Sequence, residues 1–77
     1  MATNPNTTAS LIVEAMTKAD RTMKWTAERS GIADATFRRK IHGGGDFTVS
    51  EVARIAKSLS IHPSTLLPLE FRQAVAA

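Results

Sequence analysis

The sequence contains no cysteine and no tyrosine, and only 5% of its residues are aromatic. The lack of cysteine excludes a disulfide framework, a thiolate metal site and a thiol nucleophile, and it suits a reducing compartment. The scarcity of aromatic residues argues against a β-sandwich and against a stacking platform for single-stranded nucleic acid. These absences favour an all-α chain.

Long apolar runs are also missing. The longest uncharged apolar stretch, around Leu11, Ile12 and Val13, is far shorter than the roughly 20 residues that a membrane helix needs. No basic leader is recognisable before it, so secretion is not expected. We expect a cytoplasmic protein with no membrane partner. Its 77 residues are enough for one small domain and exclude two.

Charge is distributed unevenly along the chain, whose formal net charge is +3. Residues 21–42 hold six cationic side chains against two carboxylates, those of Glu28 and Asp34. A compact cationic stretch on an otherwise nearly neutral chain indicates a localised polyanion-binding surface. The alternative is a solvated helix face, which the charge pattern alone does not exclude.

Hydrophobic periodicity divides the chain into short helices. We predict helices over residues 8–20, 23–30, 33 or 34 to 41, and 49 to 60 or 61, and a fifth that starts at Pro63 and is cut short by Pro68. Residues 1–7 are small and polar and are expected to form a flexible terminus. Residues 69–77 form a tail that either docks on the core as a helix or meets a second subunit.

Local signals mark the helix ends. Thr22 is placed to cap the second helix, and Gly31 stands where a helix ends in a left-handed residue. Three consecutive glycines at 43–45 stop the third helix.

The start of the fourth helix is the best defined. Thr48 and Glu51 form a capping box, and Phe47 before the cap is placed to pack onto Val52. The apolar period of this helix leaves Arg54, Lys57 and Ser58 facing outward.

The helix near residues 33–41 has two different faces. With Phe37 at the centre of the buried side, Ala33 and Ile41 lie within about 40° of it and are expected to face the core. The opposite side is basic and narrow, with a small side chain near the N-terminal end of the helix. Such a helix fits the major groove of DNA, which is about 12 Å wide. It carries Ala35, Arg38, Arg39 and His42, with Asp34, Thr36 and Lys40 along the flanks.

Residues 22–67 resemble the phage repressor and Cro-like (Xre-type, lambda-repressor-like) helix-turn-helix family. The matching residues are Ala27, Gly31, Ile32, Thr36, Phe37, Ile41 and Gly43, the capped stretch 47–51, and the helix ending at 55–61. The resemblance implies a compact five-helix domain over residues 8–68. It also implies a sequence-specific regulator of transcription, such as a repressor in a bacterial or phage-infected cell, which binds a double-stranded DNA operator.

The resemblance also implies individual roles. It places Asp34, Ala35, Arg38 and Arg39 at base-reading positions, and Thr22, Met23, Lys24, Thr36, Lys40 and His42 near phosphates. Met23 departs from the family, in which a glutamine often stands at this position. Thr26 and Ser30 also replace larger apolar residues, so Met23, Trp25 and the first helix are expected to supply compensating packing.

Several residues have a plainer interpretation beside the functional one. Asp34 is expected first as a helix cap, because a carboxylate near phosphates is repelled unless it accepts from cytosine. Arg39 contacts either a base edge or a phosphate, and Arg29, Lys24 and Lys40 are either phosphate contacts or plain surface. Trp25 is expected to be packing material.

Catalysis and metal binding are not expected. His42 and His62 lie apart without ligand partners, and no nucleophile, base and orienting group can be assembled from this sequence. We therefore expect no enzyme activity, no cofactor, no metal and no small-molecule substrate.

The sequence leaves the oligomeric state and the binding partner of this protein open. The resemblance suggests a homodimer on an operator with half-sites about 34 Å apart, although a monomer is also compatible with one small module. An antitoxin-like interaction module that neutralises a partner protein through residues 69–77 is the alternative function.

Overall fold

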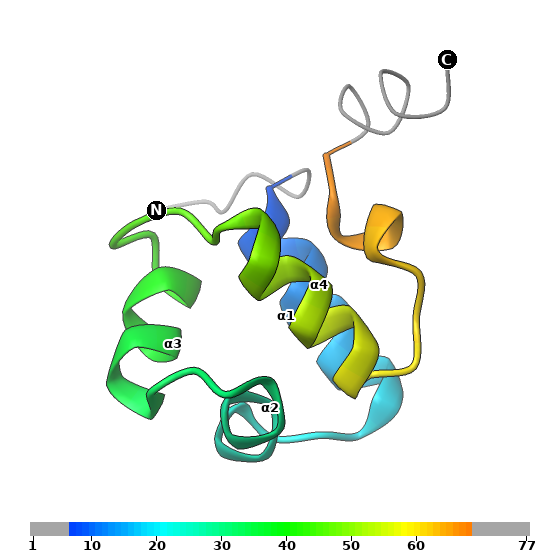
Figure 1. The fold of residues 1–77 in the computed structure, drawn as a ribbon, viewed down its shortest axis with the longest axis horizontal. Helices are drawn as coiled ribbons and strands as arrows, with labels where there is room; N and C mark the ends of the chain where they lie inside the picture. Colours follow the sequence, from blue (N-terminus) through cyan, green and yellow to red (C-terminus); the bar gives the residue numbers. More distant parts are fainter. Residues whose placement is uncertain (1–6, 69–77) are drawn as a thin grey trace.

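The computed structural model describes residues 7–68, and these residues form four α-helices and one 3-10 turn (Figure 1). Within this part of the chain there is no strand, which confirms the expected all-α character. In chain order the elements are α1 (Thr8–Ala19), α2 (Met23–Ser30), α3 (Asp34–Ile41), α4 (Val49–Ser58) and η1 (Pro63–Leu66). None of the helices described here has the length and apolar character needed to cross a lipid bilayer.

The element at the predicted fifth position is a single 3-10 turn. His62 precedes it and accepts a hydrogen bond from the Ser64 backbone through Nδ1, at 3.1 Å. Leu67 already has an extended backbone, as expected for a residue that precedes proline. The described residues thus contain four α-helices and this turn, and the expected count of five helices is not confirmed.

Helix ends follow the local signals with small differences. Thr7, which was assigned to the flexible terminus, caps α1 by accepting from the Ser10 backbone at 3.2 Å. At the other end of α1, Asp20 takes a left-handed conformation with φ of 57°, so the helix stops one residue before the predicted end. Likewise α4 stops at Ser58, because Ser60 is left-handed with φ of 58°.

Two predicted segments lie outside the described residues. They are the remaining part of the terminus, residues 1–6, and the tail, residues 69–77. The described residues therefore neither support nor contradict the alternative function, which depends on the tail.

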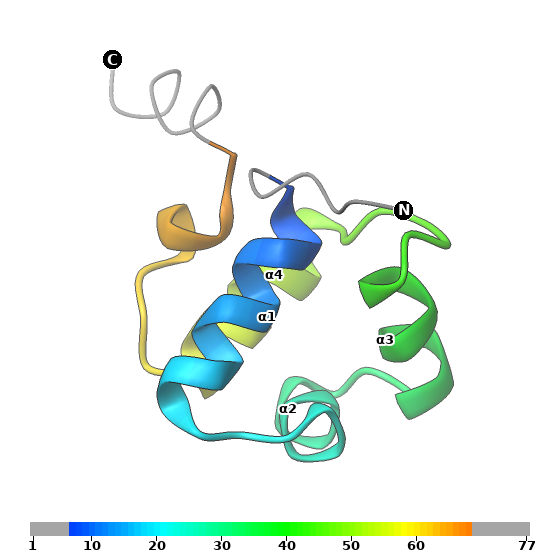
Figure 2. The ribbon, with the colours of Figure 1, turned by 180° about the vertical axis from the view of Figure 1, so that it is seen from behind.

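One hydrophobic core joins the elements (Figures 1 and 2). Helix α4 packs against α2 and η1, while α3 packs against α1 and α2. Each element contributes side chains to this core, and Phe37 of α3 is its largest fully buried residue. The buried apolar residues are Ile12, Met16, Ala27, Ile32, Phe37, Val52, Ile55, Ala56, Leu59 and Leu66.

Small polar residues line the contact between α2 and α4. Thr26 is fully buried and donates its hydroxyl to the Thr22 carbonyl at 2.9 Å. Ser30 is also buried, and its Oγ lies 3.5 Å from Oγ of Ser58 on α4. Both hydroxyls have hydrogen-bond partners. The small polar residues that stand here in place of larger apolar ones therefore leave no buried donor unsatisfied. Met23 and Trp25 pack against the core, as expected.

One residue of the expected buried face lies outside. Phe37 and Ile41 face the core as predicted, but Ala33 is exposed. Ala33 is the N-cap of α3, with φ of −58° and ψ of 137°, so its backbone is not helical. The rotation of about 100° per residue, which was used to place it on the buried face, therefore does not apply to it. Its neighbour Ile32 enters the core instead.

Candidate nucleic-acid interface

The turn between α2 and α3 is short and held by main-chain bonds. Gly31 ends α2 in the left-handed region with φ of 69°, as predicted, and the Ile32 N–H returns to the Ala27 carbonyl at 3.0 Å. At the other end of α2, the Thr22 hydroxyl accepts from the Trp25 N–H at 3.0 Å. Three residues thus connect two short helices in a defined arrangement.

Helix α3 is anchored from behind by an aromatic pair. The Phe37 ring is fully buried, and its centroid lies 5.8 Å from that of Phe47 with an interplanar angle of 64°. An edge-to-face arrangement of this kind is favoured for aromatic rings. The side of α3 away from Phe37 carries the exposed residues Ala35, Arg38, Arg39 and His42.

Arg38 is held by two neighbours. Its Nε lies 3.0 Å from Oδ2 of Asp34, and its Nη1 lies 3.9 Å from Sδ of Met23 on α2. Asp34 is therefore not the helix cap that we expected, because that position is taken by Ala33 and Asp34 is the first residue of α3. Its carboxylate serves instead to orient Arg38, in a pair that is half exposed on both sides.

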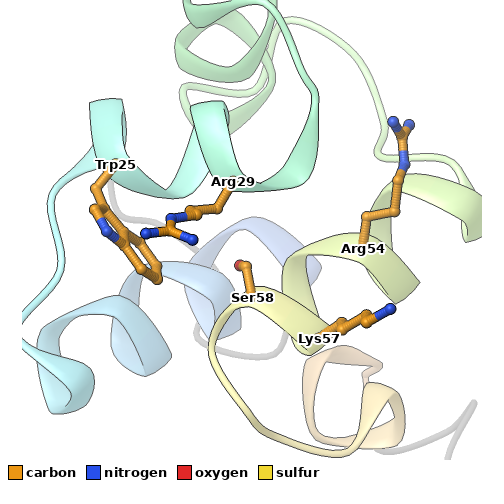
Figure 3. A pocket seen from close by; sticks show the side chains of 5 residues that line it. All are labelled: Trp25, Arg29, Arg54, Lys57 and Ser58. Atoms are coloured by element: carbon orange, nitrogen blue, oxygen red, sulfur yellow. The ribbon is translucent and has the colours of Figure 1, made fainter.

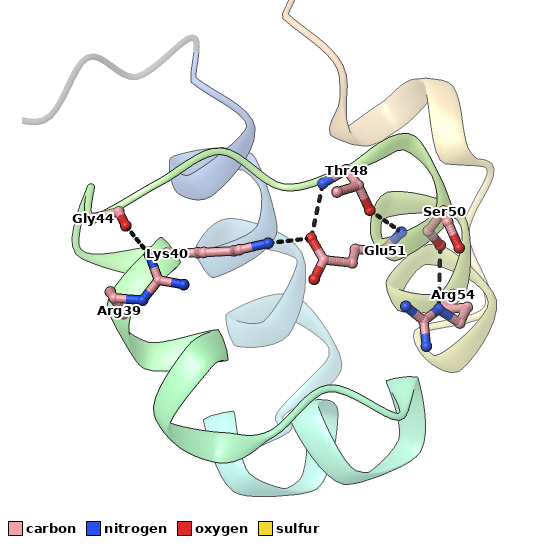
Figure 4. Close-up of polar contacts among 7 residues, drawn as sticks. All are labelled: Arg39, Lys40, Gly44, Thr48, Ser50, Glu51 and Arg54. Carbon is pink, nitrogen blue, oxygen red and sulfur yellow. Dashed lines mark hydrogen bonds and ion pairs between the residues drawn. The ribbon is translucent and has the colours of Figure 1, made fainter.

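Arg39 folds back over the glycine loop (Figure 4). Its Nη1 donates to the Gly44 carbonyl, so part of its hydrogen-bonding capacity is used within the chain. The close approach depends on glycine, because a Cβ on Gly44 would lie 2.6 Å from Cγ of Arg39 and 3.0 Å from its carbonyl oxygen. The guanidinium consequently sits at the rim of α3, beside the loop.

Lys40 is placed differently from the expected phosphate contact. Its Nζ lies 2.6 Å from Oε1 of Glu51 on α4, and both side chains are only 12% exposed (Figure 4). Glu51 also accepts from the Thr48 backbone at 2.8 Å and donates its own N–H to the Thr48 hydroxyl, so the predicted capping box is confirmed. The hydrogen bond from Lys40, followed by that from Thr48, lowers the pKa of Glu51 below its ordinary value of 4.5. Lys40 thus ties α3 to α4.

The other predicted phosphate contacts fall into two groups. Lys24 and His42 are exposed, whereas Met23 and Thr36 are half-buried. Thr22 is exposed and already caps α2. Among the residues predicted to contact DNA, the structure therefore leaves Lys24, Arg39 and His42 exposed.

No protein-family model, no curated protein and no solved structure matches this chain. The resemblance to the repressor and Cro-like family therefore stays a hypothesis. What α3 binds is inferred below from its own side chains.

A second cationic cluster was missed by the sequence reasoning. Arg54 and Lys57 were expected merely to face outward, and Arg29 was counted as a phosphate contact or plain surface. In the structure these three side chains line one cleft between α2 and α4 with Trp25 and Ser58 (Figure 3). The only signal in the sequence was the spacing of Arg54 and Lys57, three residues apart on one helix face. Their juxtaposition with α2 depends on the tertiary fold.

Proposed function

We propose that the protein is a sequence-specific, double-stranded DNA-binding regulator of transcription that places the outward face of α3 in the major groove. One observation carries this proposal. A helix anchored by the fully buried Phe37 turns a small residue and basic residues outward, and these residues are exposed. A major groove about 12 Å wide admits one α-helix.

The support of α3 suits this role. A recognition helix must keep its orientation against the pull of the phosphates, and here Phe37 fixes α3 from behind while Lys40 ties it to α4. Two short helices joined by a tight turn that contains glycine are typical of helix-turn-helix units. These features support the proposed kinship with the repressor and Cro-like family.

Arg38 is the proposed base-reading residue. Its Nε is occupied by Asp34, and this bond orients the guanidinium while its terminal nitrogens keep donors for the groove. Arginine pairs well with the O6 and N7 acceptors of guanine, and Ala35 on the same face suits contact with a thymine methyl group. Arg39 is assigned to a phosphate, because its guanidinium is held at the rim by Gly44. Lys24 and His42 are the other proposed phosphate contacts.

The test compares two arginine variants on two kinds of duplex. Preferred duplexes are selected from a random pool, and affinities of wild type, Arg38→Ala and Arg39→Ala are measured by fluorescence anisotropy on a preferred and a random duplex. Arg38→Ala should cost about 1–3 kcal/mol on the preferred duplex and much less on the random one. Arg39→Ala should weaken both equally and reduce the salt slope by about 1.

Lys18→Ala is the matched control. Lys18 lies on α1, 75% exposed and 2.9 Å from Glu14, so its removal changes the net charge by the same amount without touching α3. Absence of binding to any duplex at low ionic strength would overturn the proposed function. Equal losses for Arg38→Ala on both duplexes would overturn only the assignment of Arg38 to base reading.

A further inference from the structure

The cleft between α2 and α4 gathers cationic side chains from two helices. Its volume is about 440 Å³, and it is lined by Trp25 and Arg29 of α2 and by Arg54, Lys57 and Ser58 of α4 (Figure 3). This volume lies within the range of about 300–1,000 Å³ that is usual for small-ligand sites. None of these lining residues comes from α3, so the cleft is separate from the proposed DNA-reading face.

The charge of the cleft is unbalanced. Arg29, Arg54 and Lys57 contribute three positive charges, and no carboxylate is among the lining residues. Over residues 7–68, the ion pairs are those of Lys18, Arg38 and Lys40, so none of the three cleft cations has an acidic partner there. Like charges brought into one cleft repel one another, and a bound anion would relieve that repulsion.

Contacts within the chain orient two of the three cations. The Arg29 guanidinium carbon lies 5.3 Å from the centroid of the Trp25 ring, which also receives Arg21 at 4.2 Å. Such cation–π contacts hold an arginine over an aromatic face. Arg54 donates through Nε to the Ser50 carbonyl at 3.4 Å, and this leaves its terminal nitrogens available (Figure 4).

Ser58 contributes shape rather than a donor. Its hydroxyl proton is directed to the Ile55 carbonyl at 2.7 Å. A ligand in the cleft must therefore be bound by the two guanidinium groups and the ammonium group. Arginine forks match the oxygens of phosphate in pairs, and lysine adds a point charge.

We propose that this cleft binds a compact polyanion of the oligophosphate class through Arg29, Arg54 and Lys57, with Trp25 as the residue that positions Arg29. Three cations that line one cleft without a carboxylate favour a group with several negative charges over a single carboxylate. The phosphates would come either from a free oligophosphate or from the backbone of bound DNA. This inference is independent of the reading of bases by Arg38.

The chain supplies its own probe for the test. Trp25 is the single tryptophan and lines the cleft, so intrinsic fluorescence reports on the surroundings of this one side chain. Inorganic pyrophosphate is titrated into the full chain at constant ionic strength, with sodium chloride as the comparison. We expect a saturable change in Trp25 emission and a matching one-site isotherm in calorimetry. Arg54→Ala and Lys57→Ala should each weaken binding about tenfold, whereas Lys18→Ala should leave it unchanged.

The two sources of phosphate are separated by a second titration. If pyrophosphate saturates, the ligand is a free oligophosphate. If only duplex DNA changes the Trp25 emission, and Lys57→Ala abolishes that change, the phosphates belong to the DNA backbone. The proposal is overturned if neither ligand gives a saturable change, or if the cleft variants behave like Lys18→Ala.

Controls separate this proposal from the proposed function and from misfolding. Arg38→Ala should bind pyrophosphate as wild type does, even if DNA recognition fails. Arg54 and Lys57 are exposed on α4, so their variants should keep the wild-type circular dichroism and unfolding midpoint. A loss of pyrophosphate binding with an unchanged fold then reports on the cleft itself.

Discussion

Lys40 and Glu51 form an ion pair between α3 and α4, with Nζ 2.6 Å from Oε1. The lysine comes from the last turn of α3, and the carboxylate closes the capping box at the start of α4. One carboxylate thus both begins a helix and holds its neighbour. The orientation of the proposed recognition helix depends on this pair.

Removal of Lys40 should destabilise the domain rather than merely weaken DNA binding. Lys40→Ala leaves the largely buried Glu51 without its cationic partner, and we expect a loss of about 1–3 kcal/mol in the free energy of unfolding. Lys18→Ala, which breaks the exposed pair with Glu14, should cost less than about 0.5 kcal/mol. Urea denaturation of both variants measures the difference. Similar losses for the two would show that burial adds nothing to the Lys40 pair.

The same pair predicts a pH dependence of stability. Because folding lowers the pKa of Glu51 below 4.5, the unfolded chain binds the proton more readily than the folded one. The stabilisation is present above that value and is lost as the pH falls through the folded pKa. Unfolding free energies measured from about pH 6 down to about pH 3 should fall more steeply for wild type than for Glu51→Gln. Parallel curves would contradict this origin of the acid sensitivity.

Asp34 is predicted to lower the affinity for duplex DNA in general and to raise the preference for a specific duplex. Asp34→Ala removes a carboxylate from the face that meets phosphates, so affinity for a random duplex should rise about threefold at low salt. Affinity for a preferred duplex should rise less or fall, since Arg38 loses the partner that orients it. Anisotropy titrations on both duplexes measure the ratio, with Glu14→Ala as the charge-matched control on α1. An equal rise on both duplexes would mean that Asp34 does not orient Arg38.

Gly44 is predicted to be required for space rather than for a special backbone angle. It is not among the glycines with positive φ, yet a Cβ there would lie 2.6 Å from Cγ of Arg39. Gly44→Ala should cost about 1–2 kcal/mol of stability and displace the Arg39 side chain. The same substitution in an Arg39→Ala background should cost less, because the flexible part of the clash is gone. Additive losses in this double-mutant cycle would assign the strain to the loop backbone alone.

Much of the fold was predictable because its signals are local. The helix boundaries at Thr22, Gly31 and Thr48 depend on caps and turns that involve residues within a few positions of one another. With Phe37 as the centre of the buried face, the helical period also placed Ile41 against the core, and both positions are confirmed. The same arithmetic was wrong for Ala33, because that residue leaves the helical backbone. The end of α4 was also displaced, since nothing in the sequence marks Ser60 as left-handed.

The amino-acid sequence by itself determined the four α-helices, the caps of α2 and α4 and the basic outward face of α3, since each depends on neighbours along the chain. Only the tertiary structure decided which cations are used internally and which meet in one place. Lys40 and Glu51 are joined across the loop between α3 and α4, and Arg29 of α2 lines one cleft with Arg54 and Lys57 of α4. Periodicity places a residue on a face, but the partner of that face is set by how the helices pack around the common core.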